Sequence, residues 1–463
     1  EEFFALTYPT YNLRQLMKDV LLRLAGKSDK AVRQLELTYG GGKTHTLITA
    51  YHLVRDPASL PDLPAVREFV EHAGVQPPQA RVAILACDKL DVEKGMEIVS
   101  PDGTKRWLRH PWSVLAWQIA GPEGLQVLHP DSKPEERDSV PAENLMDELM
   151  RLPQRDGLAT LVLIDEVLMY AREKVRLDPA WRDALTSFFQ YLTQAAAKPG
   201  MPCCVVASLL ATDPAKSDEL GKAITADLYA VFRRENEEGI QPVEKTDVAE
   251  VLRRRFFKPE SIADPGAFRP YVSAALRGIC DLDEQTKKGG ADAEERFLAS
   301  YPFHPDLTEV LYSKWTNLEG FQRTRGVLRT FALALRDAER WDQSPLVSCN
   351  VFLTESGRPG ISHGLQELTK IATTEEYEGK RQDWSAIIEG ELDKARGAQA
   401  DYPGVKHREV EQAVVATFLH SQPVGQRAST AEVMVLVGHT RPDRIEIGKA
   451  MLRWGRESWF LDE

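Results

Sequence analysis

Short apolar runs alternate, along the first half of the chain, with segments whose apolar residues recur at helical spacing. Near-continuous apolar runs are typical of strands that are covered on both faces, and the alternation favours a parallel sheet between two helical layers. Strands are predicted at residues 32–38, 81–87, 161–164, 203–209 and 240–243. Helices are predicted after the first strand and at residues 112–120, 142–151, 179–198 and 217–234. The pattern therefore predicts an α/β core with five strands over residues 1–245.

From residue 246 onward the pattern becomes mostly helical. Residues 246–345 are predicted as a helical lid on the core, and residues 346–405 as a connecting helical segment. Two charged stretches that contain proline or glycine, at residues 131–139 and 284–295, are predicted as surface loops. The second of these loops is expected to interrupt the lid.

The last segment, residues 406–463, is predicted as a winged-helix-like domain. One helical stripe is formed by Val410, Val414, Val415, Phe418 and Leu419. Ser429 and Glu432 make a capping box that begins a second helix. A third helix at residues 442–456 and a strand at residues 458–461 complete the expected arrangement.

Composition and charge narrow the class of protein only slightly. The 463 residues are 43% hydrophobic and carry a formal net charge of −12, which argues against sequence-blind coating of nucleic acid but allows a local basic groove. No apolar run approaches the roughly 18 residues of a membrane helix, and no secretory leader is visible, so we expect a cytoplasmic protein without membrane contact. The first residue is not methionine, which indicates a fragment of a longer chain. Adjacent Cys203 and Cys204 are expected to be buried in a strand, and none of the five cysteines shows zinc-ligand spacing.

The loop after the first predicted strand carries the clearest candidate chemistry. Residues 34–46 read QLELTYGGGKTHT, so an apolar strand runs into three glycines, a lysine and a threonine and then into a helix. Such a loop lets backbone N–H groups close around a polyphosphate, while the lysine reaches the β and γ phosphates and the threonine hydroxyl ligates Mg²⁺. The sequence therefore predicts a nucleoside triphosphate site at Gly40, Gly41, Gly42, Lys43 and Thr44.

This loop departs from the usual phosphate-binding pattern at one position. The pattern G-x-x-x-x-G-K-[ST] requires a first glycine where the chain has Leu37. An ordinary glycine-rich turn is the alternative, but the helical spacing of Leu47, Tyr51 and Val54 favours the strand, loop and helix order of a nucleotide site. His45 belongs to the candidate site by position, and its ring is expected to pack or hydrogen-bond in the first helical turn rather than to act as a base.

A second candidate element follows the predicted strand at residues 161–164, where LVLI leads directly into Asp165 and Glu166. Asp165 is expected to hold Mg²⁺ through water, and Glu166 is expected to orient or deprotonate the attacking water. Taken alone, the motif has a plain alternative, a strand whose terminal carboxylates are solvated. Together with the lysine loop it predicts a site that hydrolyses a nucleoside triphosphate with Mg²⁺. ATP is the expected nucleotide, and GTP is the alternative that these motifs leave open.

This order of elements, followed by a mostly helical segment, resembles the AAA+ class of P-loop ATPases. In that class a polar residue near the end of the fourth strand senses the γ phosphate, which implies Ser208, with Thr212 as a substitute. An arginine at the end of the next helix completes the site of a neighbouring subunit, which implies Arg233 or Arg234 and a homo-oligomer. The alternatives are a serine that is satisfied by the backbone and a solvated basic helix end, which suits the negative end of the helix dipole.

The stretch FQRTRGVLR, residues 321–329, resembles the AAA+ lid motif whose arginine contacts the nucleotide. Arg325 and Arg329 are the candidates. Because the arginines at positions 323, 325 and 329 cannot share one helical face, at least one is expected to serve structure or solvation. By contrast, the arginines at 253–255 are expected to pack and to form ion pairs.

The stretches ELTYGGGKTHTL, LVLIDEV, YPFHPDL and FQRTRGVLR together resemble a bacterial and archaeal ATPase family named only as domain of unknown function 499. The resemblance spans the chain and includes the N-terminal FFALTYPTYNLRQLMKDVLLRL and the missing first glycine. Members of this family look to be encoded beside DNA methyltransferases and helicases in anti-phage or restriction-like gene clusters. The resemblance therefore implies DNA-linked defence with a methyltransferase, helicase or effector as partner, whereas the residues alone indicate only ATP chemistry.

The third helix of the winged-helix-like segment offers a group of cations to a partner. These are Arg441, Arg444, Lys449, Arg453 and Arg456. Basic helices of this kind contact DNA phosphates or base edges. A module that docks another protein and a solvated basic face are the alternatives.

These expectations combine into an AAA+-like ATPase that hydrolyses ATP with Mg²⁺ and remodels DNA or a protein partner in a defence complex. Lys43, the metal and an arginine are expected to stabilise the charge on the transferred phosphoryl group. The alternative is a nucleotide-gated switch that recruits a methyltransferase or effector with negligible turnover. A kinase-like transferase is disfavoured by the long lid and the winged segment.

Overall fold

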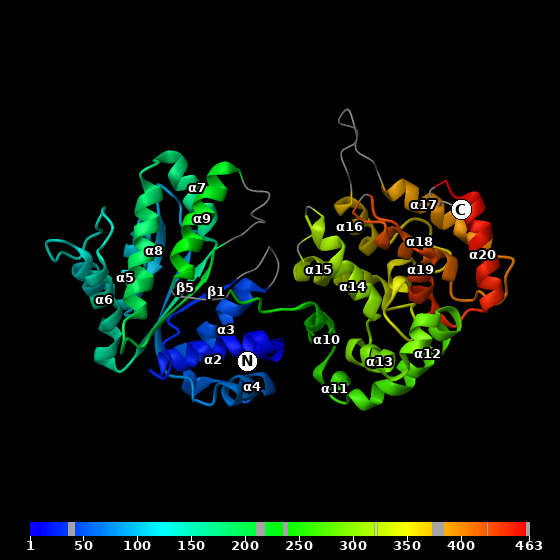
Figure 1. Ribbon diagram of the computed structural model, residues 1–463, viewed down its shortest axis with the longest axis horizontal. Coiled ribbons are helices and arrows are strands. Elements are labelled where there is room, and N and C mark those ends of the chain that lie inside the picture. Colours follow the sequence, from blue (N-terminus) through cyan, green and yellow to red (C-terminus); the bar gives the residue numbers. More distant parts are fainter. Residues whose placement is uncertain are drawn as a thin grey trace. The chain divides into compact units, whose positions relative to one another are not determined.

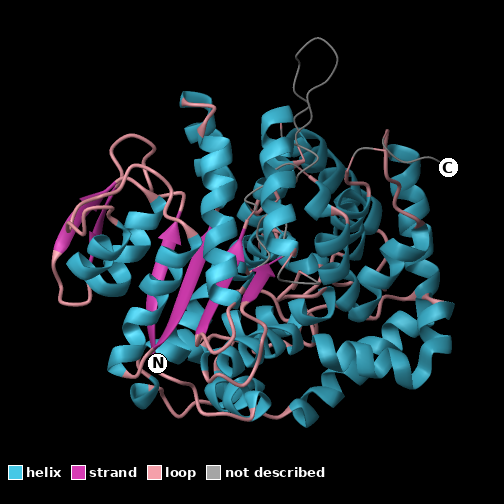
Figure 2. Cartoon of the chain, turned by 60° about the vertical axis from the view of Figure 1, so that its left-hand side comes forward, coloured by secondary structure: helices cyan, strands magenta, loops and turns pink. Residues whose placement is uncertain are grey.

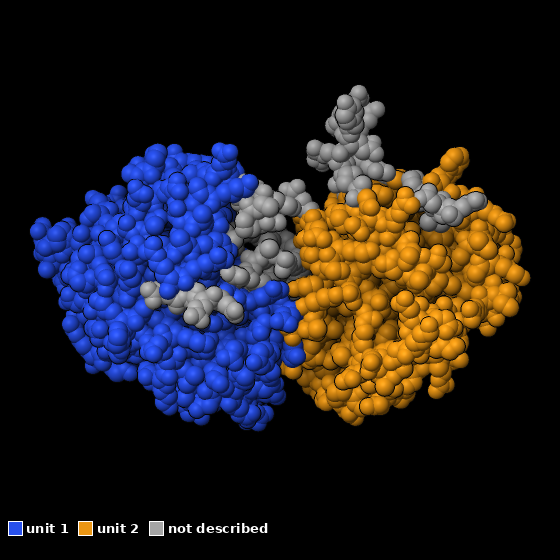
Figure 3. Space-filling view, in the orientation of Figure 1, with its two compact units in different colours: residues 1–244 blue, residues 245–463 orange. Residues whose placement is uncertain are grey.

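The computed structural model describes residues 1–35, 42–209, 218–234, 239–318, 320–321, 323–372, 384–423 and 425–459. The chain forms two compact units, Glu1–Glu244 (unit 1) and Lys245–Glu463 (unit 2), coloured separately in Figure 3. Unit 1 contains a parallel sheet with helices, and unit 2 is helical. The predicted boundaries inside unit 2, at residues 345 and 405, stay predictions.

A four-stranded parallel sheet in the order β1-β6-β5-β2 forms the centre of unit 1. Its strands are β1 (Val32–Leu35), β2 (Ala80–Ala86), β5 (Ala159–Asp165) and β6 (Cys203–Ser208), and Figure 2 shows their arrows side by side. All of β6 is buried, and so is β5 except at its last residue, as expected of strands covered on both faces. The predicted burial of Cys203 and Cys204 in a strand is confirmed.

The fifth predicted strand, at residues 240–243, does not form a ladder. Ile240 makes one isolated parallel bridge with Leu35 of β1. Pro242 cannot donate a ladder hydrogen bond, and its carbonyl oxygen accepts instead from the Thr10 hydroxyl. The prediction of five strands is therefore wrong: Ile240 N donates to Gln34 O of β1 at 3.0 Å, but the next two carbonyls accept from the side chains of Thr10 and Asn12 instead of from a strand.

Helices cover both faces of the sheet (Figure 1). Next to α1 (Glu2–Ala5), one layer contains α2 (Tyr11–Leu24), α3 (Lys43–Arg55) and α4 (Pro64–Ala73). The other contains α5 (Pro111–Leu128), α6 (Glu143–Arg151), α7 (Val167–Leu177), α8 (Trp181–Ala197) and α9 (Glu219–Arg233). Successive residues of β5 serve opposite layers, since Leu161 and Leu163 pack with the first and Val162 and Ile164 with the second. This alternation explains why the strand is apolar throughout.

A small antiparallel hairpin of β3 (Met96–Val99) and β4 (Lys105–Leu108) was not predicted. Its turn contains Gly103 in the left-handed region, at φ 88°, and Asp102 Oδ1 accepts from Thr104 N at 2.9 Å. The turn sequence Pro-Asp-Gly between two strand-like runs is a hairpin signal in its own right. A search for buried parallel strands misses it, because both hairpin strands are largely exposed.

Unit 2 is an assembly of helices around one main core. They are α10 (Val248–Phe256), α11 (Pro259–Ile262), α12 (Arg269–Leu282), α13 (Glu284–Ser300), α14 (Pro305–Ser313), α15 (Arg323–Ala338), α16 (His363–Ile371), α17 (Trp384–Gln399), α18 (Glu409–His420), α19 (Thr430–Val437) and α20 (Arg444–Glu457). The largest cluster of buried hydrophobic residues in this unit includes Val248 near its start and Trp454 near its end. Both ends of the unit therefore pack into the same core.

The charged stretch 284–295 was expected to be a loop and lies instead within α13. Asp283 caps this helix, because its side chain accepts from Thr286 N at 2.7 Å. The glycines that suggested a loop are accommodated by a bend at Gly290, which has φ 50°. The other predicted loop, residues 131–139, contains neither helix nor strand.

Near the C-terminus, the predicted helices correspond to α18, α19 and α20. Ser429 and Glu432 form the predicted capping box at the start of α19: Glu432 N donates to Ser429 Oγ, and Ser429 N donates to Glu432 Oε2. The predicted strand at residues 458–461 is not formed at residues 458 and 459, and residues 460–463 lie outside the described residues.

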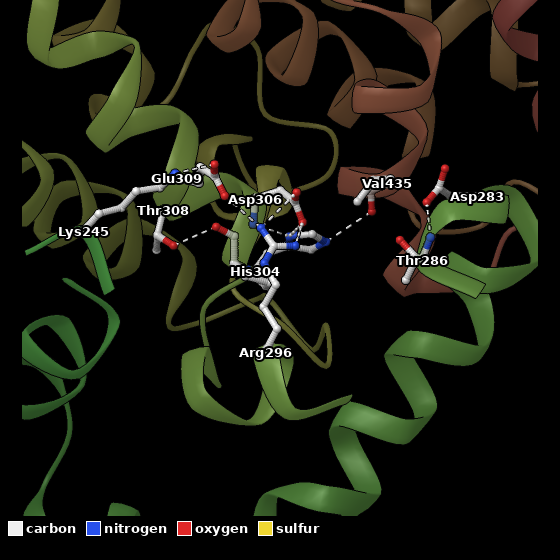
Figure 4. A network of polar contacts seen from close by, with 10 residues as sticks. Lys245, Asp283, Thr286, Arg296, His304, Asp306, Thr308, Glu309 and Val435 are labelled. Atoms are coloured by element: carbon white, nitrogen blue, oxygen red, sulfur yellow. Dashed lines mark hydrogen bonds and ion pairs between the residues drawn. The ribbon is translucent and has the colours of Figure 1, made fainter. Parts of the chain in front are cut away.

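The stretch YPFHPDL, residues 301–307, contributes to a polar network in unit 2 that is built around the buried ring of His304 (Figure 4). His304 caps α14 by accepting from Asp306 N at 3.2 Å and donates from Nε2 to Val435 O at 3.2 Å. Burial lowers the pKa of His304 to about 4, so the ring is neutral near pH 7. Arg296 bridges Asp306 and Glu309 at 3.1 and 3.0 Å. This motif therefore has a structural role.

The close packing around Gly278 of α12 predicts that a side chain at this position lowers stability. A Cβ atom there would lie 2.3 Å from Gly438 O and 3.0 Å from Arg441 Cα. We expect Gly278→Ala to lower the free energy of unfolding by about 1–3 kcal/mol, as overpacking does. Gly390, also within a helix, has open space around it, so Gly390→Ala should raise that free energy by about 0.5–1 kcal/mol.

Chemical denaturation of the two variants against the parent chain checks this prediction. Equal effects of Gly278→Ala and Gly390→Ala would show that the close approach of α12 to residue 438 is not formed in solution.

Candidate functional site

The candidate site lies at the carboxyl edge of the parallel sheet in unit 1. Strands β1, β5 and β6 run in the same direction, so their carboxyl ends meet at one edge. Of the predicted glycines, Gly40 and Gly41 lie outside the described residues, as does Leu37. Gly42 is the residue before α3 and has φ 85°, a left-handed conformation that favours glycine. The described part of the loop therefore turns sharply into the helix, as the sequence pattern requires.

Lys43 and Thr44 occupy the first turn of α3. Lys43 is buried, with 7% of its surface exposed. Burial lowers the pKa of its ammonium group, and Asp165 and Glu166 raise it in part. The Thr44 hydroxyl donates to Asp165 Oδ2 at 3.1 Å. Two candidate residues that lie more than a hundred positions apart in sequence are thus in direct contact.

Asp165 is the last residue of β5 and faces Ser208, the last residue of β6. Burial raises the pKa of the Asp165 carboxyl, whereas the hydroxyls of Ser208 and Thr44 and the charge of Lys43 lower it. Asp165 Oδ1 and Ser208 Oγ are both buried and make no hydrogen bond of ordinary geometry with the described residues. Buried polar atoms of this kind need a partner, and a hydrated cation with phosphate oxygens would supply one.

Glu166 follows Asp165 in an unusual backbone conformation. It has φ 56° and ψ 40°, a left-handed conformation that costs a residue other than glycine about 1 kcal/mol or more. Leu168 N donates to Leu209 O at 3.2 Å, which fastens the start of α7 to the end of β6. Burial, then Asp165 and Asp88, raise the pKa of Glu166. At this strained turn the Glu166 carboxylate, whose pKa is raised, lies next to Asp165 at the carboxyl edge of the sheet.

One acidic residue at this edge, Asp88, was not predicted as a site residue from the sequence. Asp88 follows β2, the strand that pairs with β5 in the register Ala86↔Asp165. Its charge contributes to the raised pKa of both Asp165 and Glu166, and its side chain pairs with Lys89 at 3.0 Å. The signal was available, because Asp88 ends an apolar run in the same way that Asp165 does.

His45 takes part in packing on the other side of α3. Its ring stacks on Phe3 with centroids 4.6 Å apart, and its Nε2 lies 3.1 Å from Thr7 Oγ1. These contacts agree with the expected packing role. They do not involve Asp165 or Glu166.

The predicted arginines are placed on helix ends and surfaces. Arg233 and Arg234 are both exposed at the end of α9, and Arg233 lies over the Tyr229 ring at 5.0 Å. In unit 2, Arg325 and Arg329 are exposed on α15, and Arg329 pairs with Glu367 at 2.9 Å. The predicted substitute sensor Thr212 lies outside the described residues.

The packing role expected for the basic cluster at 253–255 is found for its first two members. Arg253 is 8% exposed and donates from Nε to Tyr301 O at 2.7 Å. Arg253 and Arg254 both pair with Glu250, one turn earlier in α10.

Magnesium and a nucleotide fit the donor set that these residues present. In the part of the chain that the structure describes, no group of three or more His, Cys, Asp or Glu side chains forms a metal site on its own. Mg²⁺ bound with a nucleotide needs only one or two protein oxygens, since phosphates and water complete its octahedron. The Thr44 hydroxyl and the Asp165 carboxylate, 3.1 Å apart, are suitable ligands directly or through water.

Similarity to known proteins is found for one family. Within the described residues, no helix is both long and apolar enough to cross a membrane. Neither the curated proteins nor the solved structures contain a significant match. The family model described as the DUF499 N-terminal domain matches residues 1–235, which include the whole sheet and the candidate site. The chain therefore belongs to the DUF499 family.

Proposed function

We propose that this chain binds ATP with Mg²⁺ and hydrolyses it at the carboxyl edge of the unit 1 sheet. The observation that carries the proposal is the contact between Thr44, in the first turn of α3, and Asp165, at the end of β5, at 3.1 Å. This contact brings a glycine-lysine-threonine helix start together with a strand that ends in two carboxylates. Such a pairing is suited to a triphosphate and its metal.

Each residue of the proposed site has a distinct task. The ammonium of Lys43, held in a mostly buried position, would neutralise phosphate charge, and a bound anion would offset the effect of burial on its pKa. Thr44 and Asp165 would hold Mg²⁺, which supplies further positive charge to the phosphates. Glu166 would orient the attacking water and accept its proton, a role for which a raised pKa is suited. Ser208, beside Asp165, would contact the γ phosphate.

The proposed core is of the P-loop type and AAA+-like. It is supported by the strand, glycine and helix succession at Gly42 and by the placement of Ser208 on β6. This strand lies between β1, which precedes the glycine loop, and β5, which ends at Asp165. An arginine from a neighbouring copy, Arg233 or Arg234, would complete the site in an oligomer. Unit 2 would supply the lid, with Arg325 or Arg329 toward the nucleotide, and a winged-helix-like end.

The wider role proposed here rests on the family resemblance and not on the site. We infer an anti-phage or restriction-like system in which ATP hydrolysis remodels DNA or a protein partner, such as a methyltransferase, helicase or effector. The basic residues of α20, which include Arg444 and Arg453, are the proposed DNA contact. Arg453 pairs with both Asp401 and Glu457, so Arg444 and Arg456 are the better candidates on that helix.

A nucleotide-gated switch is the second candidate. Arg233 lies against Tyr229 of its own helix, so a chain without a neighbouring copy would hold ATP without the arginine proposed for turnover, and this favours a switch. In a switch, ATP would be bound by the same residues, and a partner would trigger or replace hydrolysis.

Steady-state ATP hydrolysis by the purified chain tests the proposal. ATP turnover is expected in the presence of Mg²⁺ and should disappear when EDTA removes the metal. It should rise when duplex or single-stranded DNA is added. Tight ATP binding without turnover under all of these conditions would favour the switch. Absence of both binding and turnover would refute the nucleotide site.

A further inference from the structure

A cavity with several cationic residues on its wall lies within unit 2, apart from the residues of the proposed ATP site. Its volume is about 500 Å³, which falls in the range of pockets that hold small molecules. The walls come from the start of α18, the turn before α20, and the segment that follows α15. The residues that matter for its chemistry are Trp341, Asn350, Lys406, Arg408, His439 and Arg441.

Two of the wall residues have a strained backbone. Arg408 and Arg441 have φ values of 61° and 60°. Among the described residues, only four residues other than glycine have a positive φ. They are Arg408, Arg441, Ser132 and Glu166, and the last of these belongs to the proposed ATP site. Strained residues of this type cluster at functional sites, because a ligand contact justifies their cost. Arg408 stands directly before α18 and Arg441 directly after the 3-10 helix Gly438–Thr440, so the strain at these two helix ends supports a site only together with the charge of the cavity wall.

Cationic side chains outnumber carboxylates on the cavity wall. Arg408 is held by Glu411, through contacts of 2.8 and 2.7 Å, and is already compensated. Lys406 and Arg441 are exposed and form no ion pair with any described residue. The one carboxylate on the wall, Asp342, accepts from the Ser344 hydroxyl at 2.9 Å. Two cations are thus available to an anionic group.

Two residues on the cavity wall, Asn350 and His439, carry buried polar atoms that have no partner among the described residues. Asn350 is 3% exposed; its Oδ1 accepts from Ser348 N, which leaves Nδ2 as a donor without a partner among the described residues. His439 is 1% exposed and donates from Nδ1 to Leu436 O at 3.0 Å. Burial lowers the pKa of His439 to about 3, so its Nε2 is an unprotonated acceptor, also without a partner there.

Close packing fixes the position of the cationic turn. Gly278 of α12 approaches Gly438 so closely that a Cβ atom at residue 278 would lie 2.5 Å from Arg441 Cγ. The left-handed residue Arg441 is therefore held by the backbone around it, and its side chain is exposed. An exposed arginine on a fixed backbone, with no ion pair to a described residue, is suited to bind phosphate.

We propose that this cavity binds a small organic phosphate of about the size of a mononucleotide. The phosphate would contact Lys406 and Arg441, and the uncharged polar part would lie toward Asn350 and His439, with Trp341 available to an aromatic ring. A concave pocket with a buried polar side favours a small ligand over a nucleic acid strand, whose backbone follows an open groove. This second site is independent of the proposed hydrolysis at Lys43.

Ligand binding is tested in a chain that carries Lys43→Ala, so that the proposed ATP site does not contribute. The probes are inorganic phosphate, AMP, GMP, CMP and UMP, titrated by calorimetry in a buffer without sulfate. At least one nucleotide is expected to bind. Its dissociation constant should rise about tenfold or more in Arg441→Gln and in Lys406→Gln, because each removes one charge-assisted contact.

Arg277→Gln is the matched control, since Arg277 is exposed on α12 and does not line the cavity. It should leave the dissociation constant unchanged. Circular dichroism and the thermal midpoint establish that each variant is folded. The proposal is overturned when no probe binds, or when Arg441→Gln and Arg277→Gln weaken binding equally. Stronger binding of a single-stranded oligothymidylate than of any mononucleotide, weakened by Arg441→Gln and by Arg444→Gln, would overturn it in favour of a nucleic acid surface.

Discussion

Replacement of Glu166 by glutamine is expected to leave ATP bound and to lower its hydrolysis by about 10²–10⁴-fold, the usual contribution of a general base. Glutamine retains the shape and one oxygen of the side chain but cannot accept a proton. The contacts proposed for binding belong to other residues, Lys43 and Thr44 in the first turn of α3. Binding of a fluorescent ATP analogue and steady-state phosphate release, measured on the same preparation, separate the two effects.

Glu173→Gln provides the matched control for this prediction. Glu173 is an exposed glutamate on α7, the same helix that Glu166 precedes, and it does not contribute to the pKa shifts of the site. Its replacement should change neither binding nor turnover. Turnover in Glu166→Gln equal to that of the parent chain would remove Glu166 from its proposed role, and the neighbouring Asp88 would become the next carboxylate to test.

Replacement of Lys43 by alanine is expected to abolish tight ATP binding, with an affinity loss of about a hundredfold or more. Lys43 is a mostly buried cation beside Asp165 and Glu166. Without it, two carboxylates would face the phosphates with less compensation, since Asp165 and Glu166 both lie within reach of its charge. Equilibrium binding of ATP with Mg²⁺, by calorimetry, measures the loss.

Lys89→Ala is the control for Lys43→Ala. Lys89 also follows a strand at the carboxyl edge of the sheet, but it is exposed and pairs with Asp88 at 3.0 Å. Its loss should change ATP affinity only slightly. Tight ATP binding that survives Lys43→Ala would contradict the nucleotide site itself, and the proposals for Thr44 and Asp165 would fall with it.

The two variants together separate the proposed ATPase from the switch. In an ATPase, Glu166→Gln should retain ATP and lose turnover, while Lys43→Ala loses both. In a switch with negligible turnover, only Lys43→Ala should have a measurable effect, and that effect should appear in partner recruitment as well as in binding.

Much of the α/β unit could be predicted from local patterns. The apolar runs at residues 161–164 and 203–209 located β5 and β6 to within one or two residues, because a strand covered on both faces is apolar throughout. The capping box at Ser429 located the start of α19 equally well, since both of its hydrogen bonds are local.

Other elements were mispredicted because their structure depends on specific contacts, some of them between residues distant in sequence. Residues 240–243 have strand-like composition, but Pro242 cannot donate to a ladder and the Thr10 hydroxyl takes its carbonyl. Residues 284–295 are polar and rich in glycine, and they are helical because Asp283 caps the helix and its apolar residues pack elsewhere in unit 2. Composition alone does not contain these contacts.

The sequence by itself determined the chemical types at the candidate site and their order along the chain. Glycine, lysine and threonine after one apolar run, and aspartate with glutamate after another, follow from local pattern because each residue only has to end a strand or begin a helix. The contact of Thr44 with Asp165, the left-handed turn at Glu166 and the addition of Asp88 were decided by the tertiary structure. The same is true of the cavity with Lys406 and Arg441. The physical reason is that distance, burial and charge balance depend on which strands and helices become neighbours, and that order is set by the packing of the whole unit.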